Sequence, residues 1–261
     1  MRRRAAILLA IALLAAAAVF GASLARGERA QKENLIVSLD GGITPRTLPR
    51  SRPAPVAVHL AGKIMTTDHS PLPRVNWIKL ELAWRGRLFT HGLPICPRPR
   101  LAFTDDRHAL DACGGALVGR GGLFAEIFVP GQESFGIHTK LLAFNGRTSA
   151  GRPTVWVHAY SADPPVSFVL PFTVHHQPGS FRTVLVATIR RSVGPWPHVA
   201  NFHISISRNF TYRGKEHSYL TASCPIPANF TAGFLSFARA SYTFAGGVRL
   251  RPQAVRSCRA R

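Results

Sequence analysis

The stretch Val75–Trp84, VNWIKLELAW, alternates between two kinds of side chain along its length. One side of the extended chain carries Ile78, Leu80, Leu82 and Trp84, and the other side carries Trp77, Lys79, Glu81 and Ala83. A period of two residues is typical of a β-strand that has one face against a core. The stretch therefore predicts a strand in a sheet with one buried face.

The same kind of segment recurs along the rest of the chain, between turn signals such as Asn145-Gly146 and Gly246-Gly247. Further candidate strands lie at 35–39, 56–65, 123–129, 140–144, 154–160, 167–174, 183–189, 202–207, 219–224, 235–244 and 248–258. About a dozen strands with at most one short helix predict a mostly β fold, a β-sandwich or jelly-roll-like antiparallel domain. A closed barrel is the alternative architecture.

The N-terminus has the features of an export signal. Arg2–Arg4 precede an uncharged apolar run, Ala5–Phe20, and the small residues Ser23 and Ala25 suit a cleavage site. The uncharged stretch is also just long enough to cross a bilayer as an uncleaved anchor. We expect a signal peptide or signal anchor at 1–25, a polar tether at 26–33 and a β-sandwich domain at 34–261. The protein would then be extracytoplasmic, either secreted or anchored to the cytoplasmic membrane.

The chain is strongly basic. Its net charge is +21, and removal of the three leader arginines leaves +18. Such an excess favours an anionic partner, for example a cell-wall polymer or a membrane surface. Because the basic residues are scattered and no aromatic-interleaved basic stripe is present, we expect no specific nucleic-acid binding. Arginine also far outnumbers lysine, so the codon bias of a GC-rich genome is a second explanation of the charge.

Four cysteines, Cys96, Cys113, Cys224 and Cys258, predict two disulfides in an exported chain. Three pairings are possible, and we favour Cys96–Cys113 and Cys224–Cys258 because each joins nearest neighbours in the sequence. The spacing within each pair is too long for a typical zinc site. A turn at Gly246-Gly247 would place Cys258 roughly opposite Leu235, so that its disulfide holds the last strand in place.

Between the first two cysteines lies CPRPRLAFTDDRHALDAC, residues 96–113, which gathers acidic, basic and histidine side chains. We interpret it as a short helix, with Thr104 as its N-cap and Asp105 and Asp106 in the first turn. The side that faces the protein would carry Ala109, Leu110 and Cys113, and Gly114-Gly115 would end the helix. On this interpretation the aspartates and His108 serve capping and face solvent.

Other candidate reactive residues are few. An envelope hydrolase acting on glycans or esters would need several of Glu81, Glu126, His158, His175 and His203 to meet in one pocket. We expect instead that Glu81 and Glu126 lie on a solvated sheet face with cross-strand ion pairs. The histidines of the VHH segment at 174–176, His175 and His176, could converge with His158 and His203 as metal ligands, but nothing in their spacing requires it. No catalytic residue, metal site or cofactor is therefore predicted.

Several segments resemble a family of uncharacterised exported actinobacterial proteins. They are NLIVSLDGGITPRTLPRSRPAPVAVHLAGKI (34–64), GLPIC (92–96), LLAFNGR (141–147), SFVLPF (167–172) and SYLTASCPIP (218–227). The resemblance spans roughly residues 34–258 and implies a bacterial, extracytoplasmic protein without an assigned activity. Taken together, the sequence predicts an exported structural or binding module that contacts an anionic envelope partner. The alternatives are the envelope hydrolase and a membrane-anchored subunit of a surface assembly.

Overall fold

A computed structural model of the chain describes residues 28–83, 85–189 and 196–261. The expected leader at 1–25 lies outside these residues, as does Trp84 of the alternating stretch. In the described ranges no helix has both the length and the apolar character needed to span a bilayer.

Most of the described chain belongs to one 14-stranded sheet in which nearly all neighbours are antiparallel. Its ladder order is β1 (Glu28–Lys32), β2 (Leu35–Thr44), β5 (Ala57–Thr66), β13 (Pro197–Ile206), β8 (Leu117–Ile127), β9 (Phe135–Arg147), β10 (Pro153–Ala162), β11 (Pro165–His176), β12 (Thr183–Thr188), β6 (Val75–Leu82), β17 (Ala232–Phe244), β19 (Gln253–Ala260) and β3 (Thr47–Leu48), with β18 (Arg249–Leu250) beside β17. The only parallel pair among them joins β19 to β3. The mostly β antiparallel prediction is confirmed.

Short elements lie outside the main sheet. A two-stranded sheet joins β14 (Asn209–Tyr212) to β15 (Lys215–Ser218), and a three-stranded sheet joins β4 (Ala54–Pro55), β16 (Leu220–Ala222) and β7 (Arg87–Leu88). The helical elements whose bounds lie within the described residues are α2 (Asp106–Cys113) and the 3-10 turns η1 (Arg98–Arg100), η2 (Gly114–Ala116) and η3 (Ala245–Gly247).

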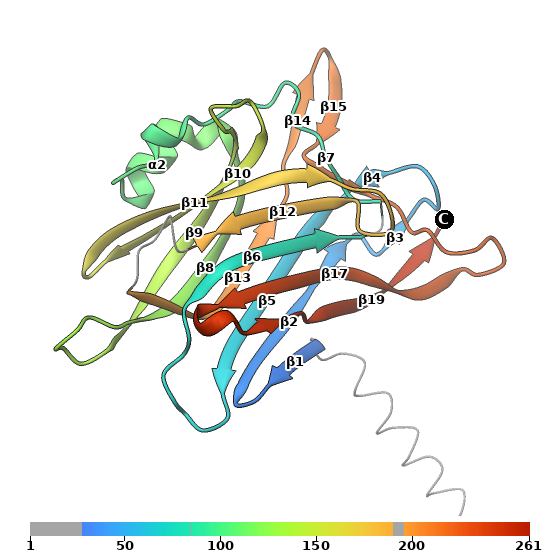
Figure 1. The fold of residues 1–261 in the computed structure, drawn as a ribbon. Helices are drawn as coiled ribbons and strands as arrows, with labels where there is room; N and C mark the ends of the chain where they lie inside the picture. Colours follow the sequence, from blue (N-terminus) through green and yellow to red (C-terminus); the bar gives the residue numbers. More distant parts are fainter. Residues whose placement is uncertain (1–27, 84, 190–195) are drawn as a thin grey trace, which may run out of the picture.

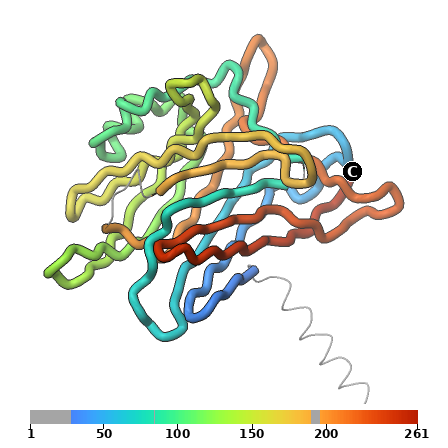
Figure 2. The backbone as a smooth tube through the Cα atoms, in the orientation of Figure 1, coloured from blue at the N-terminus to red at the C-terminus, as the bar shows by residue number. Residues whose placement is uncertain are grey.

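The main sheet curls so that its two halves face each other. In Figure 1 strands β12, β6 and β17 run in front of β8, β13, β5 and β2, and the tube in Figure 2 shows the same two layers. The far ends of the sheet come together where Arg256 of β19 donates to the carbonyl of Gly41 on β2 at 2.5 Å and pairs with Asp40. The result is the predicted β-sandwich, built from a single curled sheet.

Strand β6 behaves as its alternation predicts. Ile78 and Leu80 face the interior between the two halves of the sheet. Lys79 and Glu81 lie on the opposite face, where Glu81 pairs with Arg239 of the neighbouring strand β17. A side-chain period of two residues thus sets which face each residue of β6 occupies.

The polar segment predicted as a tether is instead a strand. Residues Glu28–Lys32 form β1 and pair with β2 from Glu28↔Leu39 to Lys32↔Leu35. None of the five side chains is buried. The segment is therefore ordered by backbone hydrogen bonds at the sheet edge and not by burial of apolar side chains. Each backbone N–H and C=O is stabilised by a hydrogen-bond partner.

The two disulfides join Cys96 to Cys113 and Cys224 to Cys258, the pairs favoured from sequence proximity. The expected position of Cys258 opposite Leu235 was wrong by two residues: Cys258 lies opposite Gly233. The β17–β19 register shifts between Ser236 and Ala238, and such a bulge changes which residues of two strands face each other. Cys224 and Cys258 are fully buried, so this disulfide lies within the core.

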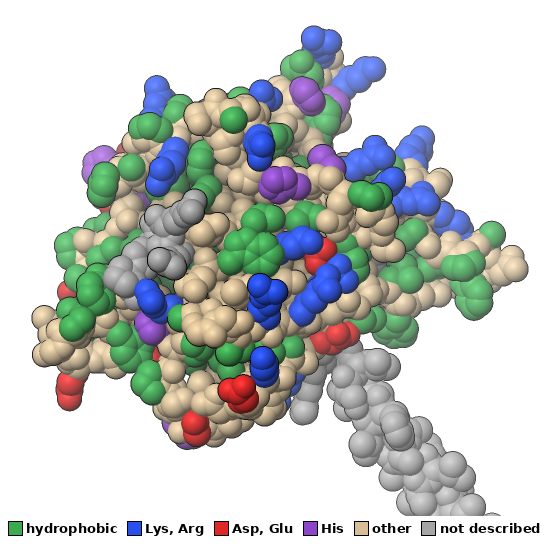
Figure 3. Space-filling model, in the orientation of Figure 1, with side chains coloured by type: hydrophobic (Ala, Val, Ile, Leu, Met, Phe, Trp, Pro, Cys, Tyr) green, Lys and Arg blue, Asp and Glu red, His purple; other side chains and the backbone are tan. Residues whose placement is uncertain are grey.

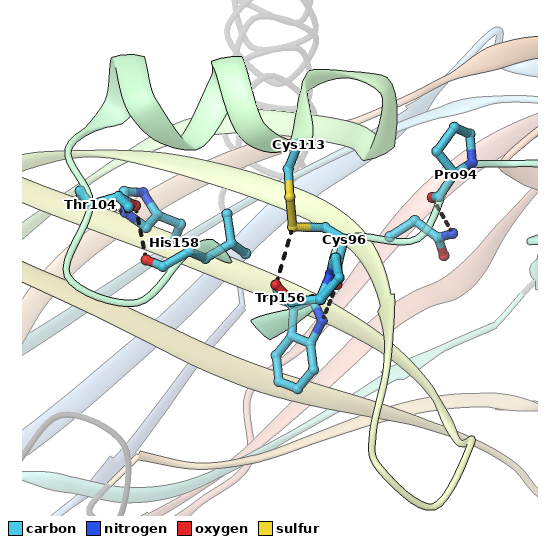
Figure 4. Close-up of a disulfide and its surroundings, with 9 residues drawn as sticks. Pro94, Cys96, Thr104, Cys113, Trp156 and His158 are labelled. Carbon is cyan, nitrogen blue, oxygen red and sulfur yellow. Dashed lines mark hydrogen bonds between the residues drawn. A yellow bond between two sulfur atoms is a disulfide. The ribbon is translucent and has the colours of Figure 1, made fainter. Parts of the chain in front are cut away.

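Helix α2 packs over the outer face of β9 and β10, as the close-up in Figure 4 shows. The expectation that Thr104 caps it was wrong by one residue, since Asp105 is the N-cap and accepts a hydrogen bond from the backbone N–H of His108 at 2.8 Å. The hydroxyl of Thr104 donates instead to the carbonyl of Leu101. Cys113 is buried on the helix side that faces the sheet, and the helix ends at Gly114 as expected.

Candidate ligand cavity

The space between the two halves of the curled sheet contains an apolar cavity. Its volume is about 140 Å³, and strands of both halves line it. Its wall is apolar: aliphatic side chains dominate, with three phenylalanines and one tyrosine, Tyr242. No lining residue is ionisable near neutral pH, because burial raises the pKa of Tyr242 further above its usual value.

Alternation along the strands aims the lining side chains inward. On β11 the inward residues are Phe168, Leu170 and Phe172, and on β13 they are Phe202, Ile204 and Ile206. The residues between them face the outside of the sheet. The cavity is thus the shared interior face of strands that are far apart in the sequence.

Several side chains that face the interior are only partly covered by their neighbours. Ile78, Leu80, Phe168 and Leu170 remain only half-buried although they face the interior. Protein interiors are normally packed closely, with few voids larger than a water molecule. Accessible surface on inward apolar residues therefore marks space that a guest molecule can occupy.

The size and lining of the cavity define what it can hold. An engineered protein cavity of about 150 Å³ lined by Leu, Ile and Phe stays dry and binds benzene. The present cavity has a similar volume and lining. It suits a small apolar group, bound through removal of apolar surface from water.

The five residues of the hydrolase alternative lie outside this cavity. Glu81, Glu126, His158, His175 and His203 occur on β6, β8, β10, β11 and β13, and none of them lines the interior. Their described side chains form no hydrogen bond or ion pair with one another. The convergence that this alternative requires is therefore not seen.

Glu81 was expected on a solvated face, and this was wrong. Its side chain is completely buried on the outer face of the sheet, where Lys79, Arg239 and Arg251 pair with it. Burial acts to raise the pKa of Glu81, but hydrogen bonds from Arg239, Lys79, Gln177 and Arg251 outweigh it and lower the pKa to about 2. The predicted cross-strand ion pair is present.

His158 is also buried, beneath α2. Its Nε2 lies 2.9 Å from the carbonyl oxygen of Thr104 and 3.3 Å from the hydroxyl of Ser167, and its Nδ1 lies 3.9 Å from Asp106. In space, Ser167, His158 and Asp106 follow one another as in a Ser-His-Asp constellation, but Nε2 donates its proton to the Thr104 carbonyl. It cannot at the same time accept the proton of Ser167, so the histidine joins the loop before α2 to the sheet.

Asp106 differs from the expectation that the aspartates of this loop face solvent. Its side chain is largely buried, and Oδ1 has no hydrogen-bond partner. Burial raises the pKa of Asp106, although the charges of His158 and Lys140 act against this. Asp105 and His108, by contrast, serve the helix cap at an exposed site, as expected.

Among the described residues, no three His, Cys, Asp or Glu side chains are arranged to hold a metal ion. Comparison of the chain with protein-family models, with curated proteins and with solved structures found no match.

The sequence did not reveal the cavity. The pattern in the sequence that corresponds to the cavity is the alternation of large apolar residues on β11 and β13, for example Phe168, Leu170 and Phe172. Alternation of this kind is equally typical of a filled core, and only the curvature of the sheet distinguishes the two.

Proposed function

We propose that this protein binds a small apolar molecule, or the apolar end of an amphipathic one, inside its curled sheet. The observation that carries the proposal is the cavity of about 140 Å³ with its wholly apolar lining. Ligand sites in proteins are typically concave and mostly apolar. The protein is a binding module in this proposal, with no reaction assigned to it.

The proposal includes a location outside the cytoplasm and membership of the exported actinobacterial family. Two buried disulfides support an oxidising compartment. Mass spectrometry of the native protein tests this part. A first residue near Arg26 supports a cleaved leader, whereas a chain that retains residues 1–25 supports an anchor.

Calorimetric titration of the full chain with benzene and with dodecanoate tests the cavity. We expect saturable binding of at least one probe with a negative heat-capacity change, which marks the burial of apolar surface. Absence of saturable binding of both probes would contradict the proposal.

A pair of variants on β13 locates the binding. Ile204 faces the cavity, and the adjacent Ser205 is exposed on the outer face. Ile204→Trp fills part of the cavity and is expected to weaken probe binding at least tenfold, about 1.4 kcal/mol. Ser205→Trp adds the same side chain outside and should leave binding unchanged. Equal affinities of the two variants, both folded by circular dichroism, would place the probes elsewhere.

A further inference from the structure

The outer face of the sheet carries a second feature, independent of the cavity. A shallow groove of about 590 Å³ lies over β6, β17 and β18 and is lined by Trp77, Ser241, Thr243, Arg249 and Arg251, among others. We call it the basic groove. No acidic residue lines it. Lys and Arg side chains gather on this face in Figure 3, over the strands β6 and β17 of Figure 1.

Strand register arranges the groove in rows. Trp77 on β6 lies opposite Thr243 on β17, which in turn lies opposite Arg249 on β18. Two residues farther along β6, on the same face of the sheet, Lys79 lies opposite Ser241 of β17. Aromatic, hydroxyl and cationic side chains thus lie side by side on a rigid sheet, and such rigid placement reduces the ordering that a ligand must cause.

The neighbouring Glu81 organises the cations. Its two oxygens receive both Nε and Nη2 of Arg239, at 2.7 and 2.9 Å, as well as Lys79 at 3.0 Å and Arg251 at 3.3 Å. Gln177 donates a further hydrogen bond. One negative charge is therefore shared among three cations, and the cluster keeps a net positive charge.

The remaining donors belong to Arg251. A guanidinium has five N–H groups. A single N–H···O contact to Glu81 is seen for Arg251, and just over half of its side chain is exposed, at 55%. Arg249, on the same groove wall, is also exposed. Two arginine forks are thus available to solvent beside Trp77, and such forks match the two oxygens of a carboxylate.

We propose that the basic groove binds an anionic polysaccharide. The arginines would pair with the carboxylates of the polymer, the hydroxyls of Ser241 and Thr243 with its hydroxyl groups, and Trp77 would supply an apolar surface for a sugar ring. A single-stranded nucleic acid is the less suitable partner, because such sites stack successive bases on several exposed aromatic side chains. Of the two aromatic residues that line this groove, Trp77 and Tyr242, Tyr242 is buried, so only Trp77 offers a ring to a ligand.

The test is binding of the full chain to polygalacturonate at low salt, compared with neutral dextran, inorganic polyphosphate and oligo-dT. We expect the tightest binding to polygalacturonate, weakening as salt rises, and none to dextran. Absence of binding to polygalacturonate at low salt would overturn the proposal. Tighter binding to oligo-dT or to polyphosphate would overturn it as well.

Matched variants separate the groove from the general basic charge. Arg249→Gln with Arg251→Gln removes two charges from the groove. Arg98→Gln with Arg100→Gln removes two exposed charges at the same sequence spacing on η1. We expect the groove pair to weaken polygalacturonate binding at least tenfold and the η1 pair less than about twofold. Equal losses of polygalacturonate affinity in the two double variants would show that the polymer is attracted by the overall positive charge, and would overturn the assignment of the site to the basic groove.

Trp77→Ala tests the sugar contact. It is expected to weaken binding of polygalacturonate while leaving the weaker binding of polyphosphate unchanged, because polyphosphate has no sugar ring. An unchanged affinity for polygalacturonate would contradict the proposal that the groove binds a polysaccharide. Circular dichroism of each variant establishes that it is folded before binding is compared.

Discussion

Arg239 and Glu81 lie opposite each other on β17 and β6, and two N–H groups of Arg239 contact both carboxylate oxygens of Glu81. The guanidinium of Arg239 also lies over the ring of Phe181, with 4.1 Å between its central carbon and the ring centre. The pair therefore joins two neighbouring strands on the outer face of the sheet and is shielded from water by an aromatic ring.

Glu81→Gln is expected to lower the free energy of unfolding at pH 7 by about 2–3 kcal/mol, because it leaves Arg239 and its companions without their counter-charge. Urea denaturation measures the change. Glu126→Gln is the control, since Glu126 on β8 has no ion pair among the described residues, and it should change stability by less than about 0.5 kcal/mol. Equal effects at both positions would contradict the importance assigned to the Glu81 cluster.

The same carboxylate predicts a pH dependence. The pKa of Glu81 is about 2 in the folded protein, below its ordinary value of 4.5. Between these values the unfolded chain binds more protons, so stability falls as pH falls from 4.5 to 2. Urea midpoints measured across this range should drop less steeply in Glu81→Gln than in the unchanged protein. Parallel profiles would show that other carboxylates account for the acid sensitivity.

Asp106→Asn is expected to stabilise the protein at pH 7 but not at pH 3. The pKa of Asp106 is raised mainly by burial, so its ionised form is disfavoured in the folded state, and this cost disappears once the group is protonated. Urea denaturation at the two pH values measures the difference. Asp111→Asn, at an exposed position of the same helix, should show no such gain at pH 7. A loss of stability in Asp106→Asn at pH 7 would show that the negative charge supports the helix.

Replacement of both Cys96 and Cys113 by Ala should loosen α2 before the rest of the protein. The helix has eight residues, too few to be stable in isolation, and the disulfide joins its last residue to the segment that contacts β9. We expect a loss of about 3 kcal/mol and faster hydrogen exchange within residues 98–116. Replacement of Cys224 and Cys258 is the comparison, and there the faster exchange should appear in β19.

Gly146→Ala is expected to destabilise the protein by about 2 kcal/mol. A Cβ at this position on β9 would lie 2.0 Å from Nε1 of Trp156, whose N–H donates to the carbonyl of Cys96. Gly114→Ala is the control, because a Cβ there meets nothing within 4 Å and its backbone is helical. Thermal unfolding of both variants measures the contrast, and equal midpoints would contradict the tight contact at Trp156.

Local patterns in the sequence predicted the features that depend on near neighbours. The alternation of Val75–Trp84 gave the faces of β6 correctly, since a side-chain period of two is a property of the strand itself. The disulfide partners followed from their closeness along the chain. The same reasoning erred by one residue at the cap of α2, where both Thr104 and Asp105 are good N-caps.

Features made by distant segments were not predictable in this way. Alternation placed Glu81 on the outer face but could not show that Arg239 and Gln177, far along the chain, would bury it. Likewise, the apolar faces of β11 and β13 indicated a core, and the cavity between them arises from the curvature of the whole sheet. Strand β1 was missed because edge pairing needs no apolar side chains.

The ladder order of the main sheet also determines when this protein can fold during its synthesis. Strand β5 pairs with β2 on one side and with β13 on the other, and β6 lies between β12 and β17. Both β5 and β6 therefore need partners from the last third of the chain. Pairing between segments so far apart is slow, and unpaired strand edges promote aggregation in the meantime. A nascent chain that ends before Pro197 leaves β5 with an open edge. Folding is therefore completed only after nearly the entire chain has been made.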